Sequence, residues 1–292
     1  MRILFWGTPA FALPALRVLT GEGFDVVGVV TQPDRPAGRG RKLRPSPVRV
    51  QAEEEGIPVL TPERPRGPEF MAQMKALAPD LSVVVAYGHI LRPEVLELPT
   101  RGSINIHASL LPELRGAAPI HWAIVRGHTE TGITIMRMTA GMDEGPILLQ
   151  RPMPIGADDT VSGLTLRLSE LGADALHETV ALLDELEPRE QEHARATYAP
   201  RIDRETARID WSKPARDVAN HVRGMDAVPG AWTEIDGEPV KLFCPRVLDG
   251  SAPDDADAPL VMTTGGGGRV AFDEVQPAGK RRMSAEAWAR GR

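Results

Sequence analysis

The sequence predicts an α/β fold with two parts: an N-terminal domain built on a Rossmann-like, mostly parallel sheet, and a small C-terminal, OB-like β-barrel. In the first half of the chain, short apolar runs rich in Val and Ile, typical of strands buried on both faces, alternate with helix-compatible segments. From residue 209 onward, short β-type segments are separated by Gly, Pro and Asp clusters. The length of 292 residues suffices for about two domains.

The expected elements of the first domain follow one another as strand, helix and strand. Strands are predicted over residues 2–7, 25–31, 59–60, 81–86, 103–107 and 132–138, and helices over residues 9–19, 48–55, 69–77 and 118–125. This alternation is typical of a parallel sheet with crossover helices. A long helix is predicted over residues 160–186, where Leu and other apolar residues recur at helical spacing, and it closes the domain.

The second domain follows a polar stretch. Residues 187–208 lack any periodicity, which is typical of a linker. Beyond it, strands are predicted over residues 231–235, 240–244, 260–263 and 268–272. The sequence therefore predicts a first, catalytic domain over residues 1–189, a linker over residues 190–207 and a C-terminal domain over residues 208–292.

Composition narrows the class of protein. Cys244 is the only cysteine, which excludes a disulfide-stapled scaffold and a Cys-rich zinc site and fits a reducing compartment. The apolar run from Ile3 to Trp6 is too short for a signal peptide, and no stretch approaches the roughly twenty apolar residues of a membrane span. We expect a cytoplasmic monomer without a membrane partner. The net charge of −6 argues against a uniform attraction for nucleic acid.

The densest polar cluster begins at Asn105 and His107. These residues stand two apart at the end of a predicted strand, so both side chains point to the same face, where open α/β sheets usually bind ligands. Asp143, in a Gly-flanked loop after the next predicted strand, is able to bond to the imidazole of His107 and fix its tautomer. Adjacent Glu144 is the competing acid. Ser109 with His107 and Asp143 also suggests a hydrolase triad, but the chain lacks a G-x-S-x-G elbow.

The stretch from residue 35 to residue 49 is basic and contains no acidic residue. Among its Gly and Pro residues it carries Arg35, Arg39, Arg41, Lys42, Arg44 and Arg49. Because it follows the second predicted strand, we expect a mobile basic loop beside the site, with charges suited to phosphate groups. A solvated charged face is the alternative interpretation.

Several motifs resemble one enzyme family, the formyltransferases that use 10-formyltetrahydrofolate. They are Asn105-x-His107-x-Ser109-Leu110-Leu111-Pro112, Arg115-Gly116-x-x-Pro119, Thr131-Gly132-x-Thr134 and the loop of Asp143. Other motifs resemble the members of this family that act on methionyl initiator tRNA, among them Gly7-Thr8-Pro9, Gln32-Pro33-Asp34-Arg35, Ala86-Tyr87-Gly88, Trp211 to Pro214 and Gly279-Lys280-Arg281-Arg282. Together these motifs span essentially the whole chain.

The resemblance implies transfer of the formyl group of 10-formyltetrahydrofolate, a cosubstrate, to the α-amino group of methionyl initiator tRNA, without a metal. It maps the catalytic trio to Asn105, His107 and Asp143 and the folate site to Ser109, Leu110, Leu111 and Pro112. It implies that the basic loop enters the acceptor stem of the tRNA, and we prefer as contacts Arg39, Arg41, Lys42 and Arg44. The C-terminal domain would bind along the inner side of the tRNA.

Two other functions fit parts of the sequence. A formyltransferase for a small amine, such as a sugar nucleotide, would carry the same trio, but the basic loop and the second domain argue against it. A noncatalytic tRNA-binding module would keep every activity when Asn105 or His107 is replaced. The chain departs from the family pattern at Glu113, Leu114, His121, His89 and Ile106, and none of these departures removes a catalytic group.

Overall fold

The computed structural model describes residues 1–37, 42–248 and 258–291. Contacts between residues divide the chain into two compact units. Unit 1 comprises Met1–Arg115, Gly132–Met153 and Leu166–Tyr198, and unit 2 comprises Gly116–Thr131, Pro154–Thr165 and Ala199–Arg292. Arg39 and Arg41, two of the expected tRNA contacts, lie outside the described residues.

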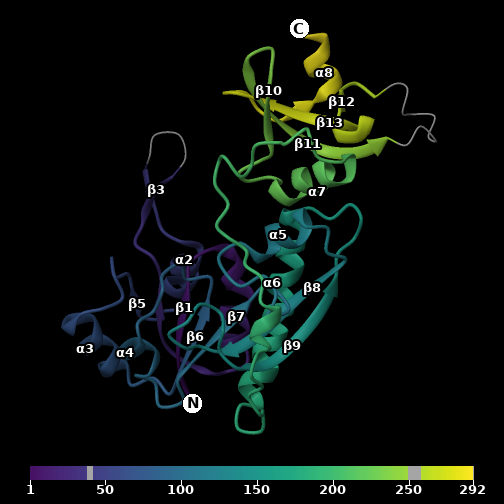
Figure 1. The fold of residues 1–292 in the computed structure, drawn as a ribbon. Coiled ribbons are helices and arrows are strands. Elements are labelled where there is room, and N and C mark those ends of the chain that lie inside the picture. Colours follow the sequence, from purple (N-terminus) through teal and green to yellow (C-terminus); the bar gives the residue numbers. More distant parts are fainter. Residues whose placement is uncertain (38–41, 249–257, 292) are drawn as a thin grey trace. The chain divides into compact units, whose positions relative to one another are not determined.

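Unit 1 is built on a seven-stranded sheet with the order β5-β2-β1-β6-β7-β8-β9 (Figure 1). Its strands are β1 (Arg2–Gly7), β2 (Asp25–Val30), β5 (Val59–Leu60), β6 (Leu81–Val85), β7 (Ser103–His107), β8 (Glu130–Arg137) and β9 (Ile147–Pro154). The pairs from β5 through β7 are parallel, and β8 runs antiparallel to β7. The predicted Rossmann-like, mostly parallel sheet is therefore confirmed.

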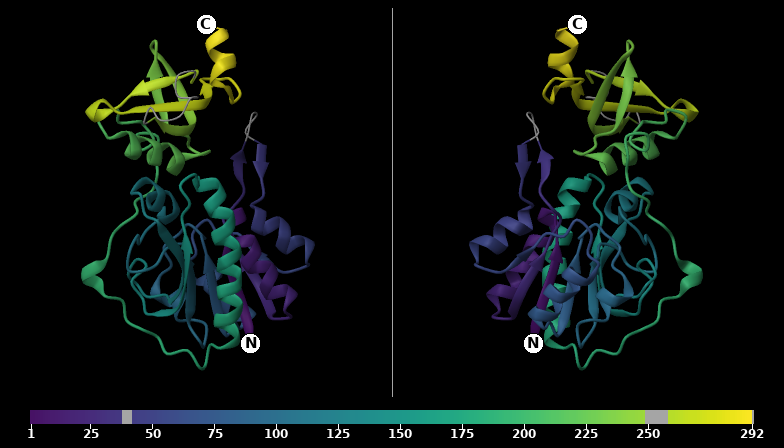
Figure 2. Two further views of the ribbon diagram at one scale, coloured as in Figure 1. Left: turned by 90° about the vertical axis from the view of Figure 1, so that its right-hand side faces the viewer. Right: turned by 90° about the vertical axis from the view of Figure 1, so that its left-hand side faces the viewer.

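Different helices cover the two faces of this sheet. The helices are α1 (Leu13–Gly21), α2 (Pro47–Glu54), α3 (Pro68–Leu77), α4 (Pro93–Leu96) and the long α6 (Val161–Ala181), which runs along the sheet in Figure 2, with short 3-10 turns at Ala10–Ala12 and His193–Arg195. On one face, Leu4, Trp6 and Val84 pack against α3 and α4. On the other, Gly172 of α6 approaches β7 so closely that a Cβ atom would lie 3.2 Å from Ile106 Cγ2.

The alternation along β7 separates its apolar from its polar side chains. Ile104 and Ile106 are buried, Ile106 on the face under α6. Ser103, Asn105 and His107 point to the opposite face, because side chains alternate along a strand. The polar residues of β7 therefore lie on the face of the sheet that packs against α3 and α4.

Three elements of unit 1 differ from the sequence expectation. β9 was not predicted, because Gln150, Arg151 and Pro152 interrupt its apolar pattern, and α4 is too short to show a helical period. The expected basic loop contains a two-stranded antiparallel sheet of β3 (Arg35–Ala37) and β4 (Lys42–Arg44).

Unit 2 contains an antiparallel sheet that curls into a half-barrel, as predicted. Its strands are β10 (Trp232–Ile235), β11 (Glu238–Leu248), β12 (Val261–Thr263), β13 (Arg269–Pro277) and β14 (Met283–Ser284), in the order β10-β11-β13-β12 with β14 beside β13. Its core is formed by buried side chains such as Leu242, Val270 and Phe272. This confirms the expected small C-terminal β domain.

In the described part of unit 2, helices α5 (Pro119–Val125), α7 (Ala215–Met225) and α8 (Ala285–Arg290) accompany that sheet, with a 3-10 turn at Gly265–Gly267. α7 was not predicted, although its buried Val218, Val222 and Met225 recur at helical spacing. α5 packs on α7, where a Cβ atom at Gly224 would lie 2.5 Å from Val125 Cγ2. No helix in the described ranges is long and apolar enough to cross a membrane.

Candidate active site

His107 lies at the carboxyl end of β7 with a protein partner at each ring nitrogen. The residue is 5% exposed. Its Nε2 lies 2.9 Å from the carbonyl oxygen of Leu114, and its Nδ1 lies 3.6 Å from Oδ2 of Asp143. Because a carbonyl oxygen only accepts hydrogen bonds, Nε2 carries a proton and donates it to Leu114. The ring is therefore fixed in orientation, with its other nitrogen facing a carboxylate.

Both partners of His107 have left-handed backbones. The φ angle is 58° at Leu114 and 53° at Asp143. A residue with a Cβ atom in this region costs of order 1–3 kcal/mol, and it persists only where the surroundings fix it. Such residues cluster at functional sites. The two turns that face His107 are thus held by bonds from elsewhere in unit 1, such as the one that Leu114 N donates to Thr197 Oγ1 at 2.9 Å.

Asn105 lies two residues before His107, on the same face of β7. It is half-buried, and its register partners are Val84 in β6 and Met136 in β8. Within the described part of the chain, its side-chain amide makes no hydrogen bond. An amide that is half-buried between two apolar neighbours is therefore available to donate to a ligand.

Asp143, and not Glu144, is the acid that faces His107. The Asp143 side chain is 18% exposed, whereas that of Glu144 is 45% exposed and lies 3.9 Å from Arg115 Nη1. Ser109 is also close in sequence, but its hydroxyl donates to Glu113 O at 2.6 Å. The geometry thus gives no support to the hydrolase triad.

The predicted folate loop, Ser109–Pro112, is tied to β8. Thr134 Oγ1 donates to Ser109 O at 2.6 Å and accepts from Leu111 N at 3.1 Å. Leu111 also packs with Met136 and Ile147. Since Met136 is the register partner of Asn105, the loop is held on the strand next to the candidate catalytic residues.

The loops that follow β1, β2 and β6 meet at one carbonyl group. Tyr87 O accepts from Thr8 Oγ1 at 3.1 Å and from Gln32 Nε2 at 3.0 Å. The Tyr87 ring packs on Trp6, and burial raises the pKa of its hydroxyl to about 12. That hydroxyl therefore stays protonated at neutral pH, and this corner of the site carries no charge from it.

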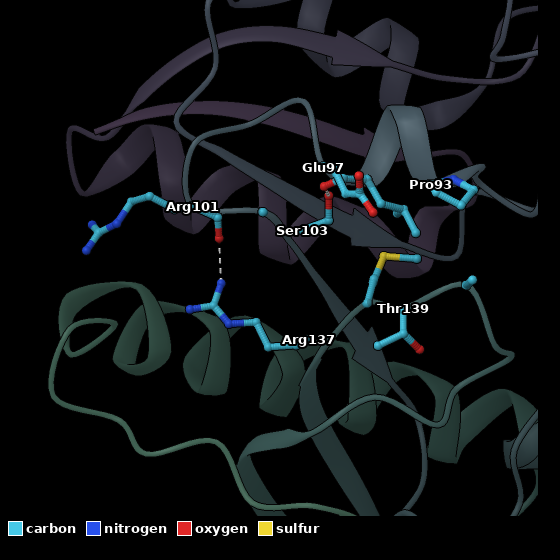
Figure 3. Close-up of a pocket in the computed structure, with 10 residues that line it drawn as sticks. Pro93, Glu97, Arg101, Ser103, Arg137 and Thr139 are labelled. Atoms are coloured by element: carbon cyan, nitrogen blue, oxygen red, sulfur yellow. Dashed lines mark hydrogen bonds between the residues drawn. The ribbon is translucent and has the colours of Figure 1, made fainter.

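A cavity of about 300 Å³ lies at the amino end of β7 (Figure 3). Ser103 of β7, Leu96 of α4 and Met138 after β8 are among its lining residues. Arg137 donates from Nη1 to Arg101 O at 2.6 Å, as the dashed line in Figure 3 marks. Burial, with Arg101 nearby, lowers the pKa of the Arg137 guanidinium below its usual range. None of the residues predicted for the site lines this cavity.

The basic segment is only partly described. Arg44 in β4 is exposed, and the backbone of Lys42 belongs to the same strand. Arg35 donates to Gln32 Oε1, and Arg49 lies within ion-pair distance of Asp34 and Glu53. Of the four expected tRNA contacts, Arg44 is the one whose side chain the structure describes, and it is exposed.

Two buried polar residues to which the sequence assigns no role, Arg115 and Gln191, lie at the loops around His107. Arg115 is 2% exposed and Gln191 is 4% exposed. Gln191 comes from the stretch expected to be a linker, and it bonds to Arg115 and to the Asp143 loop. No pattern in the sequence marks this glutamine as buried. Among the residues that the structure describes, no cluster of three or more His, Cys, Asp or Glu is arranged to hold a metal ion.

Gly145, two residues after Asp143, has no room for a side chain. A Cβ atom there would lie 1.9 Å from Arg137 O, whereas a Cβ atom at Gly141, in the same loop, would meet only the flexible Glu144 side chain. We expect Gly145→Ala to cost about 1–3 kcal/mol in unfolding free energy and to lower Tm by several degrees, with a loss of activity. Thermal unfolding of Gly145→Ala beside Gly141→Ala measures this, and equal Tm values for the two variants would contradict it.

Known protein families match both parts of the chain. A model of the formyl transferase family matches residues 1–180, and a model of the formyl transferase C-terminal domain matches residues 201–292. The chain is 46% identical over 297 residues to the methionyl-tRNA formyltransferase of Geobacter metallireducens, covering 100% of this chain and 96% of the relative. It is 47% identical over 291 residues to that of Dinoroseobacter shibae, covering 100% of this chain and 97% of the relative.

Solved structures share the fold at lower identity. The methionyl-tRNA formyltransferase of Clostridium thermocellum has a TM-score of 0.61 at 15% identity and covers 95% of this chain and 98% of its own. A sugar 3N-formyl transferase, solved with dTDP and 5-N-formyl-THF, has a TM-score of 0.70 at 17% identity, covering 96% of this chain and 99% of its own. HypX of Aquifex aeolicus, solved with tetrahydrofolic acid, has a TM-score of 0.64 at 17% identity, covering 99% of this chain and 46% of its own.

Proposed function

Since the chain belongs to the formyl transferase family, we infer that it transfers a formyl group from 10-formyltetrahydrofolate to the α-amino group of methionyl initiator tRNA. Its relatives at 46–47% identity over the full chain are methionyl-tRNA formyltransferases. The observation that carries the proposal is the meeting of Asp143 with His107 beside Asn105 at the carboxyl end of β7. An amide, an imidazole and a carboxylate on one face suit acyl transfer to an amine.

In this proposal, Asn105 and His107 stabilise the negative charge that develops on the formyl oxygen during attack. The bound folate supplies the formyl carbon and, as leaving group, its N10. Asn105 donates from its amide, which has no other hydrogen bond within the described residues. His107 donates its Nε2–H, which it shares between the carbonyl oxygen of Leu114 and the formyl oxygen. Loss of one such donor costs on the order of 3 kcal/mol in the barrier.

Asp143 accepts the proton that the attacking amine releases. A typical α-amino group has a pKa of about 7.7–8.0, so a useful fraction is neutral near pH 7 and needs no prior deprotonation. As its nitrogen bonds to the formyl carbon, the amine loses one proton to the Asp143 carboxylate, directly or through a water. The same proton passes to N10 when the bond between carbon and N10 breaks. Asp143 is then free for the next turnover.

The residues around β7 fit an elongated folate. The cavity of about 300 Å³ is at the small end of ligand sites, enough for a ring system and not for a whole folate. Ser103, which lines it, lies on the same face of β7 as Asn105, roughly 7 Å away along the strand. We therefore place the pteridine ring in the cavity and the formyl group at Asn105. The loop Ser109–Pro112 would then line the remainder of the donor.

The tRNA is assigned to the basic segment and to the C-terminal domain. Arg44 is exposed on β4, and Arg39, Arg41 and Lys42 carry the same charge in the sequence. Phosphate contacts of this kind position a nucleic acid without reading its sequence. We retain a catalytic domain over residues 1–189, a linker over residues 190–207 and a tRNA-binding domain over residues 208–292 as the working division. The one cysteine, Cys244, is compatible with the reducing cytoplasm proposed as the compartment.

One incubation tests the proposed reaction. The purified protein is mixed with 10-formyltetrahydrofolate and charged initiator tRNA, and the amino acid is analysed after deacylation. Formylmethionine is the expected product. A charged elongator tRNA and an amino sugar nucleotide serve as competing acceptors. Equal use of the elongator would overturn the initiator assignment, and formylation of the sugar nucleotide alone would favour a small-amine formyltransferase.

Replacing Arg44 tests the basic segment. We expect Arg44→Ala to raise KM for the tRNA several-fold while leaving folate affinity unchanged, because one phosphate contact is lost. The slope of log KM against log salt should fall by about 1. Steady-state kinetics at several salt concentrations measure both effects. Arg64→Ala, which removes another exposed arginine, is the matched control, and an equal change in KM for both variants would contradict a local contact.

A further inference from the structure

A single buried side chain, Gln191, connects the two loops that face His107. Its Oε1 accepts from Arg115 Nε at 3.1 Å and from Nη2 at 2.6 Å. Its Nε2 donates to Asp143 O at 2.9 Å and to Gly145 O at 2.8 Å. Both N–H groups and both lone pairs of the amide are thus in use, as expected of a polar group that is 4% exposed.

These bonds lead directly to both partners of His107. Arg115 follows Leu114, whose carbonyl accepts from His107 Nε2, and Asp143 provides the carboxylate at Nδ1. Both Leu114 and Asp143 have positive φ angles, a conformation that needs support from outside the turn. The amide of Gln191 provides that support to the Asp143 turn directly. It supports the Leu114 turn through the guanidinium of Arg115.

Arg115 depends on Gln191 to hold the turn at Leu114 in place. Its guanidinium also contacts His193 Nδ1 at 3.0 Å, and its nearest carboxylate, that of Glu144, is 3.9 Å away and half exposed. Two of the three hydrogen bonds that this guanidinium makes in the described structure therefore go to Gln191. A guanidinium buried at 2% exposure depends on such bonds for its orientation.

We propose that Gln191 is a positioning residue for the formyl transfer: it sets the separation and orientation of Asp143 and Leu114 about the imidazole of His107. This inference rests on the proposed function for its catalytic consequence. Gln191 does not touch His107 and acts only through the two loops. A displacement of about 1 Å in a reacting group is able to cost up to about 10²-fold in rate, which sets the scale of the expected effect.

Two substitutions distinguish the role of the accepting oxygen of the Gln191 amide from that of its donating nitrogen. Gln191→Met keeps the length of the side chain and removes all four bonds. Gln191→Glu keeps an acceptor for both hydrogen bonds from Arg115, now as an ion pair, but loses both donors to the Asp143 loop. We expect both variants to lower kcat by about 10- to 100-fold with KM for tRNA within about twofold of the parent. Gln51→Met is the matched control, because its amide also bonds at both ends, to Arg17 and Glu55, outside the site.

The decisive readout does not need the reaction. In the full-length protein without substrates, the ¹⁵N shifts of the His107 imidazole report its tautomer and its hydrogen bonds. We expect these shifts to move in Gln191→Met and in Gln191→Glu and to stay unchanged in Gln51→Met. Failure of the parent protein to make formylmethionine would overturn the proposed function and leave this readout intact.

Two results would overturn the positioning role. One is a lower Tm in the Gln191 variants together with unchanged kcat and unchanged His107 shifts, which would make the residue purely structural. The other is a large rise in KM for tRNA with kcat unchanged, which would make Gln191 part of the binding surface. If Gln191→Met fails to fold, Gln191→Glu decides between the outcomes, since it retains the bond to Arg115.

Discussion

The His107→Ala variant is expected to form formylmethionine about 10³-fold more slowly than the parent protein, with tRNA affinity nearly unchanged. The substitution removes an oxyanion donor and leaves the Asp143 carboxylate without its imidazole partner 3.6 Å away. Removal of one preorganised donor costs about 10²–10³ in kcat, which corresponds to about 3–4 kcal/mol. His107 is placed to act on the reacting atoms and not on the tRNA. The single-turnover rate of formylation should therefore fall, while filter binding of the tRNA should stay nearly unchanged.

The control for this variant is another histidine of unit 1. His177 in α6 is partly exposed and lies 3.9 Å from Glu22, away from β7. His177→Ala should retain the turnover of the parent protein. If His107→Ala loses tRNA affinity as strongly as turnover, then the variant has misfolded or His107 has been given the wrong role. Thermal unfolding of the variant distinguishes these two explanations.

Asp143→Asn is expected to lower kcat by about 10²–10³-fold. The amide retains the size of the side chain and removes the base that accepts the proton of the attacking amine, and general base catalysis contributes about 10²–10⁴-fold. The backbone of Asp143 keeps its bond to Gln191, because that bond involves the carbonyl oxygen. Single-turnover rates at saturating tRNA and folate measure the effect on the chemical step.

The neighbouring acid provides the comparison for Asp143→Asn. Glu144 is 3.9 Å from Arg115 and does not face His107, so Glu144→Gln should cost less than about 10-fold. The opposite order of effects would assign the proton acceptor to Glu144. A large fall in tRNA affinity in Asp143→Asn would show that the Asp143 loop binds the acceptor substrate and does not act in the proton transfer.

The candidate catalytic residues could be found from the sequence because β7 alternates. Polar Asn105 and His107 alternate along the strand with apolar Ile104 and Ile106. The two pairs therefore point to opposite faces of the sheet, and the apolar pair lies on the face under α6. The choice between Asp143 and its neighbour was open, because adjacent residues in a loop have no periodic pattern. It depends on a backbone turn with a φ angle of 53° at Asp143, which the sequence does not reveal.

Other features depend on contacts between distant residues. The stretch 187–208 was predicted as a polar linker, yet Gln191 is buried, because its amide makes four hydrogen bonds to three residues on loops far away in the sequence. The alternation of strands and helices predicted a mostly parallel sheet and did not single out the strand that runs the other way. That strand is β8, which is antiparallel to β7. α7 had a helical pattern of buried residues among segments that were interpreted only as strands.

The most direct test is a crystal structure of the protein with a stable formylated folate bound. The distances to measure run from the formyl oxygen to Asn105 Nδ2 and to the nearer ring nitrogen of His107. Both should be about 3 Å, with the Asp143 carboxylate within reach of an amine that approaches the formyl carbon. A formyl group bound more than one residue's length from β7, or turned away from Asn105 and His107, would contradict the mechanism.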